Sequence, residues 1–377
     1  MDIPFNRPVL AGKELEYIRE AIERGHLAGD GAFTERCQRL LAGFIGAHAV
    51  LLTHSCTAAL ELAAILIGIE PGDEVVMPSY TFVSTANAVV LRGGIPVFVD
   101  VRPDTLNIDE TLIEAAITPR TKAIFPIHYA GVPAEMDRIN ELAERYDLFV
   151  VEDAAQALGS KYKGCSAGSL GDLAAFSFHE TKNIITGEGG ALAINDPTLV
   201  ERAEIVREKG TNRKRFLRGQ VDKYTWVDLG SSFLPSELVA AFLLGQLEQS
   251  EAIQRDRVAS WKTYDAALKP LHNRGLRTPI VPPNCEDNAH LYYLLMATPE
   301  LRQELIGRMK SDGISTPFHY VPLHNAPAGL RFARTSGRLV HTEDLSARLV
   351  RLPLYPQMGN ALHRVLDRLL LHLDQLL

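Results

Sequence analysis

LFVVEDAAQALG (148–159) and FSFHETKN (176–183) are the two stretches that decide the fold, because in each an apolar run ends in chemically active side chains. The first run reads as a buried strand followed by Asp153, and the second as the end of a strand followed by Lys182. Open α/β sheets bind ligands at the carboxyl ends of their strands. These stretches therefore predict a sheet edge at which a carboxylate and a lysine converge.

Outward from these stretches, short apolar runs alternate with helix-like segments. The predicted strands are Val50–Thr53, Glu74–Met77, Val97–Val99, Ala123–Ile127, Leu148–Val151, Leu173–Phe178 and Gly190–Ile194. The predicted helices among them are Lys13–Ile22, Thr57–Ile67, Ser84–Leu91 and Met136–Tyr146. Such alternation predicts βαβ units with right-handed crossovers and a mostly parallel sheet covered on both faces.

The chain of 377 residues is longer than one typical domain of about 150 residues. We expect a large domain over residues 1–240, a connecting helix over 241–267 and a small C-terminal α+β domain over 268–377. The small domain should contain a strand at Tyr292–Ala297 and helices at Glu300–Met309 and Ala361–Leu376.

Composition excludes several classes of protein. The chain is 46% hydrophobic and 23% charged, with 39 basic and 46 acidic residues, which argues against disorder and against a protein that coats nucleic acid. Its four cysteines form no C-x-x-C pair, so a structural zinc site has no support. No secretory signal is visible in MDIPFNRPVL, and no apolar run of about 18 residues occurs. These features predict a cytoplasmic enzyme without a membrane segment.

Four groups of residues follow predicted strands. Thr53 to Leu60 passes from a strand through small and hydroxyl residues into a helix, which suits a phosphate or merely caps the helix. Asp153 is either a helix cap or a partner of a positive group. Lys182 is either a solvated charge or a nucleophile. Thr186–Gly190 permits close backbone approach but matches no phosphate-binding loop or dinucleotide fingerprint.

The order and spacing of these groups resemble the sugar aminotransferases of the DegT/DnrJ/EryC1 family, from Ile3 to Leu354. The resemblance implies an α/β fold of the aspartate aminotransferase type (fold type I) and pyridoxal 5'-phosphate (PLP) as cofactor. It also implies a homodimer with active sites at the subunit interface.

The resemblance assigns roles residue by residue. Lys182 matches the catalytic lysine that forms a Schiff base with PLP and later moves the proton. Asp153 matches the partner of the pyridine nitrogen, which must stay protonated for PLP to act as an electron sink. The remaining matches to cofactor contacts are Gln156 beside O3′, Phe82 against the ring, and Cys56, Thr57 and Ser177 at the phosphate.

Within the family, the segments 78–94, 98–118 and 207–226 resemble enzymes that aminate C4 of dTDP-4-oxo-6-deoxy-D-glucose. L-Glutamate would be the donor, and the products would be dTDP-4-amino-4,6-dideoxy-D-galactose and 2-oxoglutarate. Such a sugar is a precursor of surface polysaccharide, for example enterobacterial common antigen. Two alternatives stay open: another nucleotide-linked 3-oxo or 4-oxo sugar, including a UDP-linked one, and a regulator that binds sugar nucleotide without turnover.

Further matches concern the substrate. Residues 207–223 carry seven basic against two acidic residues, so Arg213 and Lys214 either suit a nucleotide diphosphate or form a solvated face. Tyr129, Tyr320 and His324 match segments that border the sugar pocket, although a packed structural role for the histidine is an equal alternative. Ser232 stands where many members carry the asparagine of Gly-x-Asn-x-Arg, which contacts the phosphate in the partner subunit. Its shorter side chain puts that contact in doubt.

Overall fold

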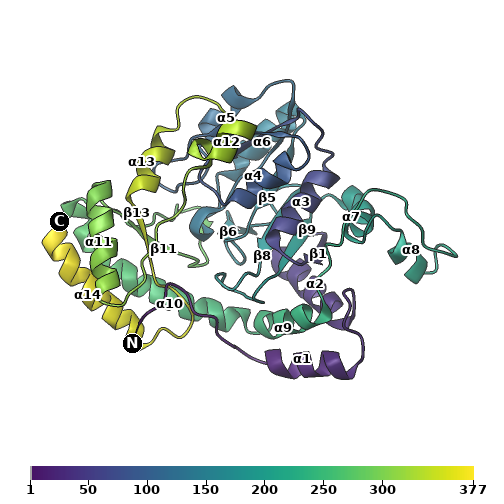
Figure 1. Ribbon diagram of the computed structural model, residues 1–377, viewed down its shortest axis with the longest axis horizontal. Helices are drawn as coiled ribbons and strands as arrows, with labels where there is room; N and C mark the ends of the chain where they lie inside the picture. The colour runs from purple at the N-terminus through teal and green to yellow at the C-terminus, as the bar shows by residue number, and fades with distance from the viewer. Residues whose placement is uncertain (1) are drawn as a thin grey trace.

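The computed structural model, which describes residues 2–377, is built around an eight-stranded sheet (Figure 1). In spatial order its strands are β1 (Ala49–Thr53), β9 (Gly190–Ile194), β8 (Leu173–Ser177), β5 (Phe149–Asp153), β4 (Thr121–Ile124), β2 (Glu74–Pro78), β3 (Ile95–Val99) and β12 (Arg334–Thr335). Only β9 runs antiparallel to its neighbours, so the sheet is mostly parallel. The predicted α/β class is confirmed.

Helices cover both faces of this sheet, because successive strand residues point to opposite sides. On β2, Val75 and Met77 join one buried cluster and Val76 joins another. The first face is covered by α3 (Cys56–Leu66), α4 (Val83–Val90) and α7 (Val200–Arg207). The second face is covered by α2 (Ala32–Ile45), α9 (Glu237–Leu247), α5 (Glu110–Ala116) and α6 (Met136–Tyr146), with α1 (Glu14–Glu23) outside α9. Side chains at the carboxyl ends of the strands remain available for a site.

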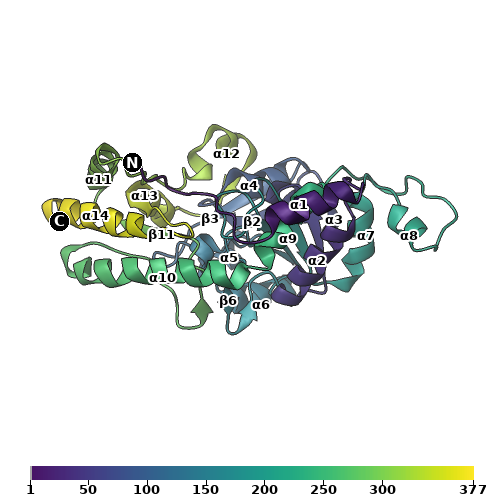
Figure 2. The same cartoon turned by 90° about the horizontal axis from the view of Figure 1, so that it is seen from below.

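The C-terminal third forms a separate layer of helices and short strands beside the large sheet (Figure 2), and most of these elements contribute to a second apolar core. Its elements are α10 (Ser250–Leu268), β11 (Tyr292–Leu295), α11 (Pro299–Ser311), α13 (Val340–Arg348), β13 (Leu349–Leu352) and α14 (Asn360–Leu376). Shorter elements are β6 (Lys161–Tyr162), β7 (Cys165–Ser166), α8 (Arg213–Leu217), β10 (Cys285–Glu286) and α12 (Pro327–Phe332). None of the helices within residues 2–377 has the length and apolarity needed to cross a bilayer.

The structure differs from the predicted elements in two places that matter for the domains. The connecting helix predicted over 241–267 is interrupted between α9 (Glu237–Leu247) and α10 (Ser250–Leu268), at residues 248–249. β12 comes from the C-terminal third, yet it pairs with β3 at the edge of the large sheet. The predicted domain limits stay a prediction, and this strand ties the two parts of the chain together.

Candidate active site

A cavity of about 670 Å³ lies where the strands of the large sheet end and the C-terminal third begins. Its walls come from the residues that follow β1, β2, β5 and β8, and from residues 290–291, 317–321 and 351. Eight of the residues singled out from the sequence line it: Cys56, Thr57, Phe82, Asp153, Gln156, Ser177, Lys182 and Tyr320. The carboxyl edge of the sheet is thus the place where these residues converge.

The N-terminus of α3 opens into this cavity. The Ser55 side chain caps the helix by accepting a hydrogen bond from the Ala58 N–H at 3.0 Å. Within the described part of the chain, the N–H groups of Cys56 and Thr57 have no hydrogen-bond partner. Unpaired N–H groups and the helix dipole together favour an anion at this position. The backbone of Gly190 lies so close that a Cβ there would stand 2.3 Å from the carbonyl carbon of Ser55.

Asp153 lies at the end of β5 and is nearly buried, at 6% exposure. Its Oδ2 accepts a hydrogen bond from the Thr85 hydroxyl at 2.6 Å, and its Oδ1 accepts one from the Ala155 N–H at 3.2 Å. Both contacts fix the direction of the carboxylate. Thr85 carries no signal in the sequence, because only the tertiary fold brings this hydroxyl on α4 to Asp153, 68 residues away.

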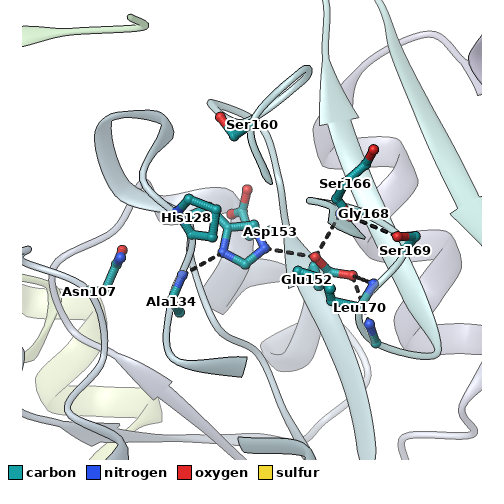
Figure 3. A network of polar contacts seen from close by, with 12 residues as sticks. Asn107, His128, Ala134, Glu152, Asp153, Ser160, Ser166, Gly168, Ser169 and Leu170 are labelled. Carbon is teal, nitrogen blue, oxygen red and sulfur yellow. Dashed lines mark hydrogen bonds and ion pairs between the residues drawn. The ribbon is translucent and has the colours of Figure 1, made fainter. Parts of the chain in front are cut away.

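Directly before Asp153, a buried network holds the end of β5 (Figure 3). Glu152 and His128 are fully buried, and the His128 Nε2 lies 2.8 Å from the Glu152 Oε2. Since the Ala134 N–H donates to the His128 Nδ1, the ring proton lies on Nε2 and is donated to Glu152. Glu152 also accepts the N–H groups of Gly168, Leu170 and Gly171 at 2.7–2.8 Å. His128 therefore has a packed structural role that supports the end of β5.

Lys182 lies in the turn after β8, where its N–H donates to the His179 carbonyl at 2.9 Å. Burial lowers the pKa of its amine, and the charge on Arg351 lowers it further, while Cys56 and Asp153 oppose the shift. A lowered pKa increases the neutral fraction of the amine, which is the form that attacks a carbonyl or accepts a proton. Burial also raises the pKa of the Cys56 thiol well above its usual range, so that thiol stays protonated.

Aromatic and amide groups form the opposite wall. Gln156 is held at both ends, because its Oε1 accepts from the Ala130 N–H at 2.7 Å and its Nε2 donates to the Tyr320 hydroxyl at 3.0 Å. The ring of Phe82 is 57% exposed, and its centroid lies 6.3 Å from that of Tyr320. A large apolar ring exposed over a cavity is available to stack on a flat ligand.

Two predicted substrate residues lie behind this wall and do not line the cavity. Tyr129 is fully buried, with its hydroxyl 3.1 Å from the His319 Nδ1. The ring nitrogens of His324 lie 2.7 Å from the Ser79 hydroxyl and 3.1 Å from Glu343. With both nitrogens engaged, His324 has the structural role that the sequence left as the alternative.

Three other predicted residues lie outside the cavity of their own chain. Ser232 is exposed, and its backbone pairs with Glu208. Arg213 forms an ion pair with Glu208, and Lys214 forms one with Asp30 at 3.1 Å. The segment that carries α8 projects from the body of the protein (Figure 1). None of the three lines the cavity within the described part of its own chain.

Nearly the whole chain is similar to known proteins. Residues 8–370 match the model of the DegT/DnrJ/EryC1/StrS aminotransferase family. GDP-perosamine synthase from Caulobacter vibrioides is 33% identical over 98% of this chain and 97% of its own length. The aminotransferase TlmJ from Streptoalloteichus hindustanus is 31% identical, with a TM-score of 0.92 over all of both chains. NtdA from Bacillus subtilis, solved with bound cofactor PMP, is 29% identical, with a TM-score of 0.86 over 96% of this chain and 82% of its own.

Proposed function

The chain belongs to the DegT/DnrJ/EryC1/StrS aminotransferase family, and from this premise we propose that it transfers an amino group from L-glutamate to C4 of dTDP-4-oxo-6-deoxy-D-glucose. The products would be dTDP-4-amino-4,6-dideoxy-D-galactose and 2-oxoglutarate. One observation carries the proposal furthest: Lys182, Asp153 and the N-terminus of α3 all open into the same cavity. The cavity is large enough for a cofactor ring with a substrate beside it.

The enzyme is a PLP-dependent aminotransferase, and its cavity fits the group. The unpaired N–H groups of Cys56 and Thr57 form a cradle for a phosphate, and Gly190, which has no Cβ, lets the backbone of β9 lie close against the start of α3. Asp153 supplies a buried, oriented carboxylate for a positively charged ring nitrogen. When bound, PLP supplies an electron sink for the negative charge that develops at the amine-bearing carbon.

The protein's own groups then have distinct tasks. We assign Lys182 to hold the cofactor and to carry a proton on its Nζ between the reacting carbons, since burial favours its neutral form. The Thr85 hydroxyl donates to the Asp153 Oδ2 and so holds the carboxylate in its orientation. The exposed ring of Phe82 would cover one face of the cofactor, and Gln156 with Tyr320 would bound its edge.

The substrate assignment rests on sequence resemblance and on relatives rather than on a contact in the cavity. The name of GDP-perosamine synthase favours a GDP-linked sugar as the second candidate. UDP-linked and 3-oxo sugars remain further candidates. Family membership favours any of these over a regulator that binds sugar nucleotide without turnover.

We further propose a homodimer in the cytoplasm, with each site completed by the partner. In the projecting segment after α8, Tyr224 and Trp226 are 55% and 78% exposed beside paired cations. Large exposed aromatic groups of this kind are typical of interaction surfaces. Ser232, Arg213 and Lys214 would then serve the partner's phosphate and nucleotide.

The test combines spectroscopy with product analysis. Purified protein should show the visible absorption of lysine-bound PLP, and Lys182→Ala should remove both that band and turnover, whereas Lys310→Ala, at an exposed lysine, should change neither. Assays with dTDP-, GDP- and UDP-linked 3-oxo and 4-oxo sugars, followed by NMR of the products, would identify the substrate. Turnover of Lys182→Ala at the parent rate would refute the role of the lysine, and preference for another nucleotide would refute the substrate.

A further inference from the structure

One imidazole in the cavity has a nitrogen without a partner. His290 is 5% exposed and lines the cavity together with Lys182. Its Nδ1 lies 2.9 Å from the Oδ1 of Asn183, a residue that does not line this cavity. Within residues 2–377, no group forms a hydrogen bond with the His290 Nε2. Nε2 is therefore the ring nitrogen that is left for the cavity side.

The position of the ring proton follows from the partners of Asn183. The Asn183 Nδ2 donates to the Asn288 carbonyl oxygen at 2.7 Å, so the Asn183 Oδ1 faces His290 and can only accept. The His290 Nδ1 therefore carries the proton. Burial lowers the pKa of His290 well below its usual range, and the charges on Lys182 and Arg257 lower it further. A neutral ring with its proton on Nδ1 has a bare lone pair on Nε2.

The Lys182 amine is the complementary group. Its Nζ forms no ion pair or hydrogen bond with the described residues. Lys182 directly precedes Asn183, so the contact that holds the His290 Nδ1 also holds the imidazole against the turn that carries the lysine. A nearly buried acceptor without a partner costs free energy, and an N–H donor from Lys182 would remove that cost.

Other ionisable groups also surround the lysine. Cys56 and Asp153 raise the pKa of its amine, and Arg351 lowers it. His319 shares the cavity, but its Nδ1 contacts the Tyr129 hydroxyl at 3.1 Å, and a hydroxyl can donate or accept, so this contact does not fix the ring proton. The remaining ionisable groups on the walls that Lys182 shares are Arg7, His179, Glu180, Glu188, Asp256 and Tyr320.

We propose that His290 is a positioning residue whose Nε2 accepts a hydrogen bond from the Lys182 amine whenever the lysine is not joined to the cofactor. The contact directs the amine and stabilises its charged form after it has taken up a proton. The inference rests on the role of Lys182 in the proposed aminotransferase function, but not on the identity of the sugar or of the amino donor.

A pair of variants separates the two nitrogens of the ring. Asparagine can keep an N–H where the His290 Nδ1 lies but has no atom at the position of Nε2. Glutamine can place its amide oxygen near the position of Nε2 but gives up the N–H toward Asn183. His290→Asn thus removes the proposed acceptor, and His290→Gln keeps it. His363→Asn, at an exposed histidine on α14 outside the cavity, is the control.

The experiment follows the addition of PLP to the apoprotein as a function of pH, by the visible absorption that appears when the lysine reacts. Only the neutral amine adds to the aldehyde, so the midpoint of the pH dependence reports the pKa of free Lys182. Loss of a hydrogen bond to the charged amine should lower this midpoint by about 1–2 pH units in His290→Asn. His290→Gln and His363→Asn should keep the midpoint of the parent, and urea denaturation should show His290→Gln to be the less stable of these two.

A measurement on the parent protein does not depend on any variant. In apoprotein with ¹⁵N-labelled histidine, the Nε2 resonance that is absent from His290→Gln should shift at the same pH as the midpoint of PLP addition. A resonance that does not respond at that pH would overturn the inference.

The outcomes separate this inference from the proposed function. An unchanged midpoint in a His290→Asn protein that takes up PLP would overturn the inference alone. Equal shifts in His290→Asn and His290→Gln would also overturn it, because the contact with Asn183 rather than the acceptor would then control the lysine. A parent protein that develops no absorption band with PLP would refute the proposed function, and the inference with it.

Discussion

Glu152→Gln should destabilise the protein by an amount that follows from the buried network behind Asp153. Each oxygen of Glu152 accepts two hydrogen bonds, one pair from Leu170 and Gly171 and the other from Gly168 and His128. In the variant an NH₂ group replaces one oxygen, so in either amide orientation two donors face a donor. Reversing the His128 tautomer does not help, because its Nδ1 would then face the Ala134 N–H. Each unsatisfied buried group costs about 1–3 kcal/mol, which predicts a loss of about 3–5 kcal/mol.

Urea denaturation at neutral pH measures this loss as a difference in unfolding free energy. The matched control is Glu141→Gln, at a glutamate on α6 that pairs with Arg138 and Arg145 but is half exposed. That change should cost less than about 1 kcal/mol, as surface ion pairs do. A loss below about 1 kcal/mol for Glu152→Gln would refute the reasoning, since the network would then contribute no more than a surface pair.

Two further predictions test the cradle and the sheet edge. Gly190→Ala should lower the unfolding free energy by about 1–3 kcal/mol and weaken PLP binding, because the added Cβ would meet the backbone nitrogen of Cys56 at 2.5 Å. Calorimetry measures the change in stability, and a PLP titration measures the change in binding. Unchanged stability would contradict the prediction. Gly43→Ala, in an open helical position, should instead stabilise the protein by about 0.5–1 kcal/mol. Hydrogen bonds from Arg334 lower the pKa of Glu74 to about 2 from an ordinary 4.5, so its stabilisation is present above pH 4.5 and is lost as the pH falls toward 2. Between pH 6 and pH 3, the free energy of unfolding measured by urea titration should fall by about 2 kcal/mol more in the parent protein than in Glu74→Gln. Equal falls in the two proteins would refute this.

The strands of the large sheet could be predicted because their apolar runs are short and bounded by polar or glycine residues. The predicted strand Ala123–Ile127 extends three residues beyond the observed end of β4 at Ile124. Pro126 has no N–H with which to continue the ladder of hydrogen bonds. The break between α9 and α10 carries no Pro or Gly at residues 248–249, so no local signal marks it. Packing against different neighbours decides that break.

The site was predictable where chemistry follows a strand and unpredictable where it depends on distant contacts. Lys182 and Asp153 follow strands of the same sheet, and the structure brings both to one cavity. Glu152 stands beside Asp153 in the sequence, but its function depends on N–H groups about twenty residues away.

The strand β12 limits how the molecule can move. Arg334 pairs with β3 through its backbone, and its side chain bridges to the buried Glu74 on β2. A hinge-like swing of the C-terminal third would have to break this ladder and a buried ionic contact at once. We therefore expect short local segments, such as residues 317–321, to move when substrates enter and leave. A protease that cuts between α9 and α10 should leave the two fragments associated.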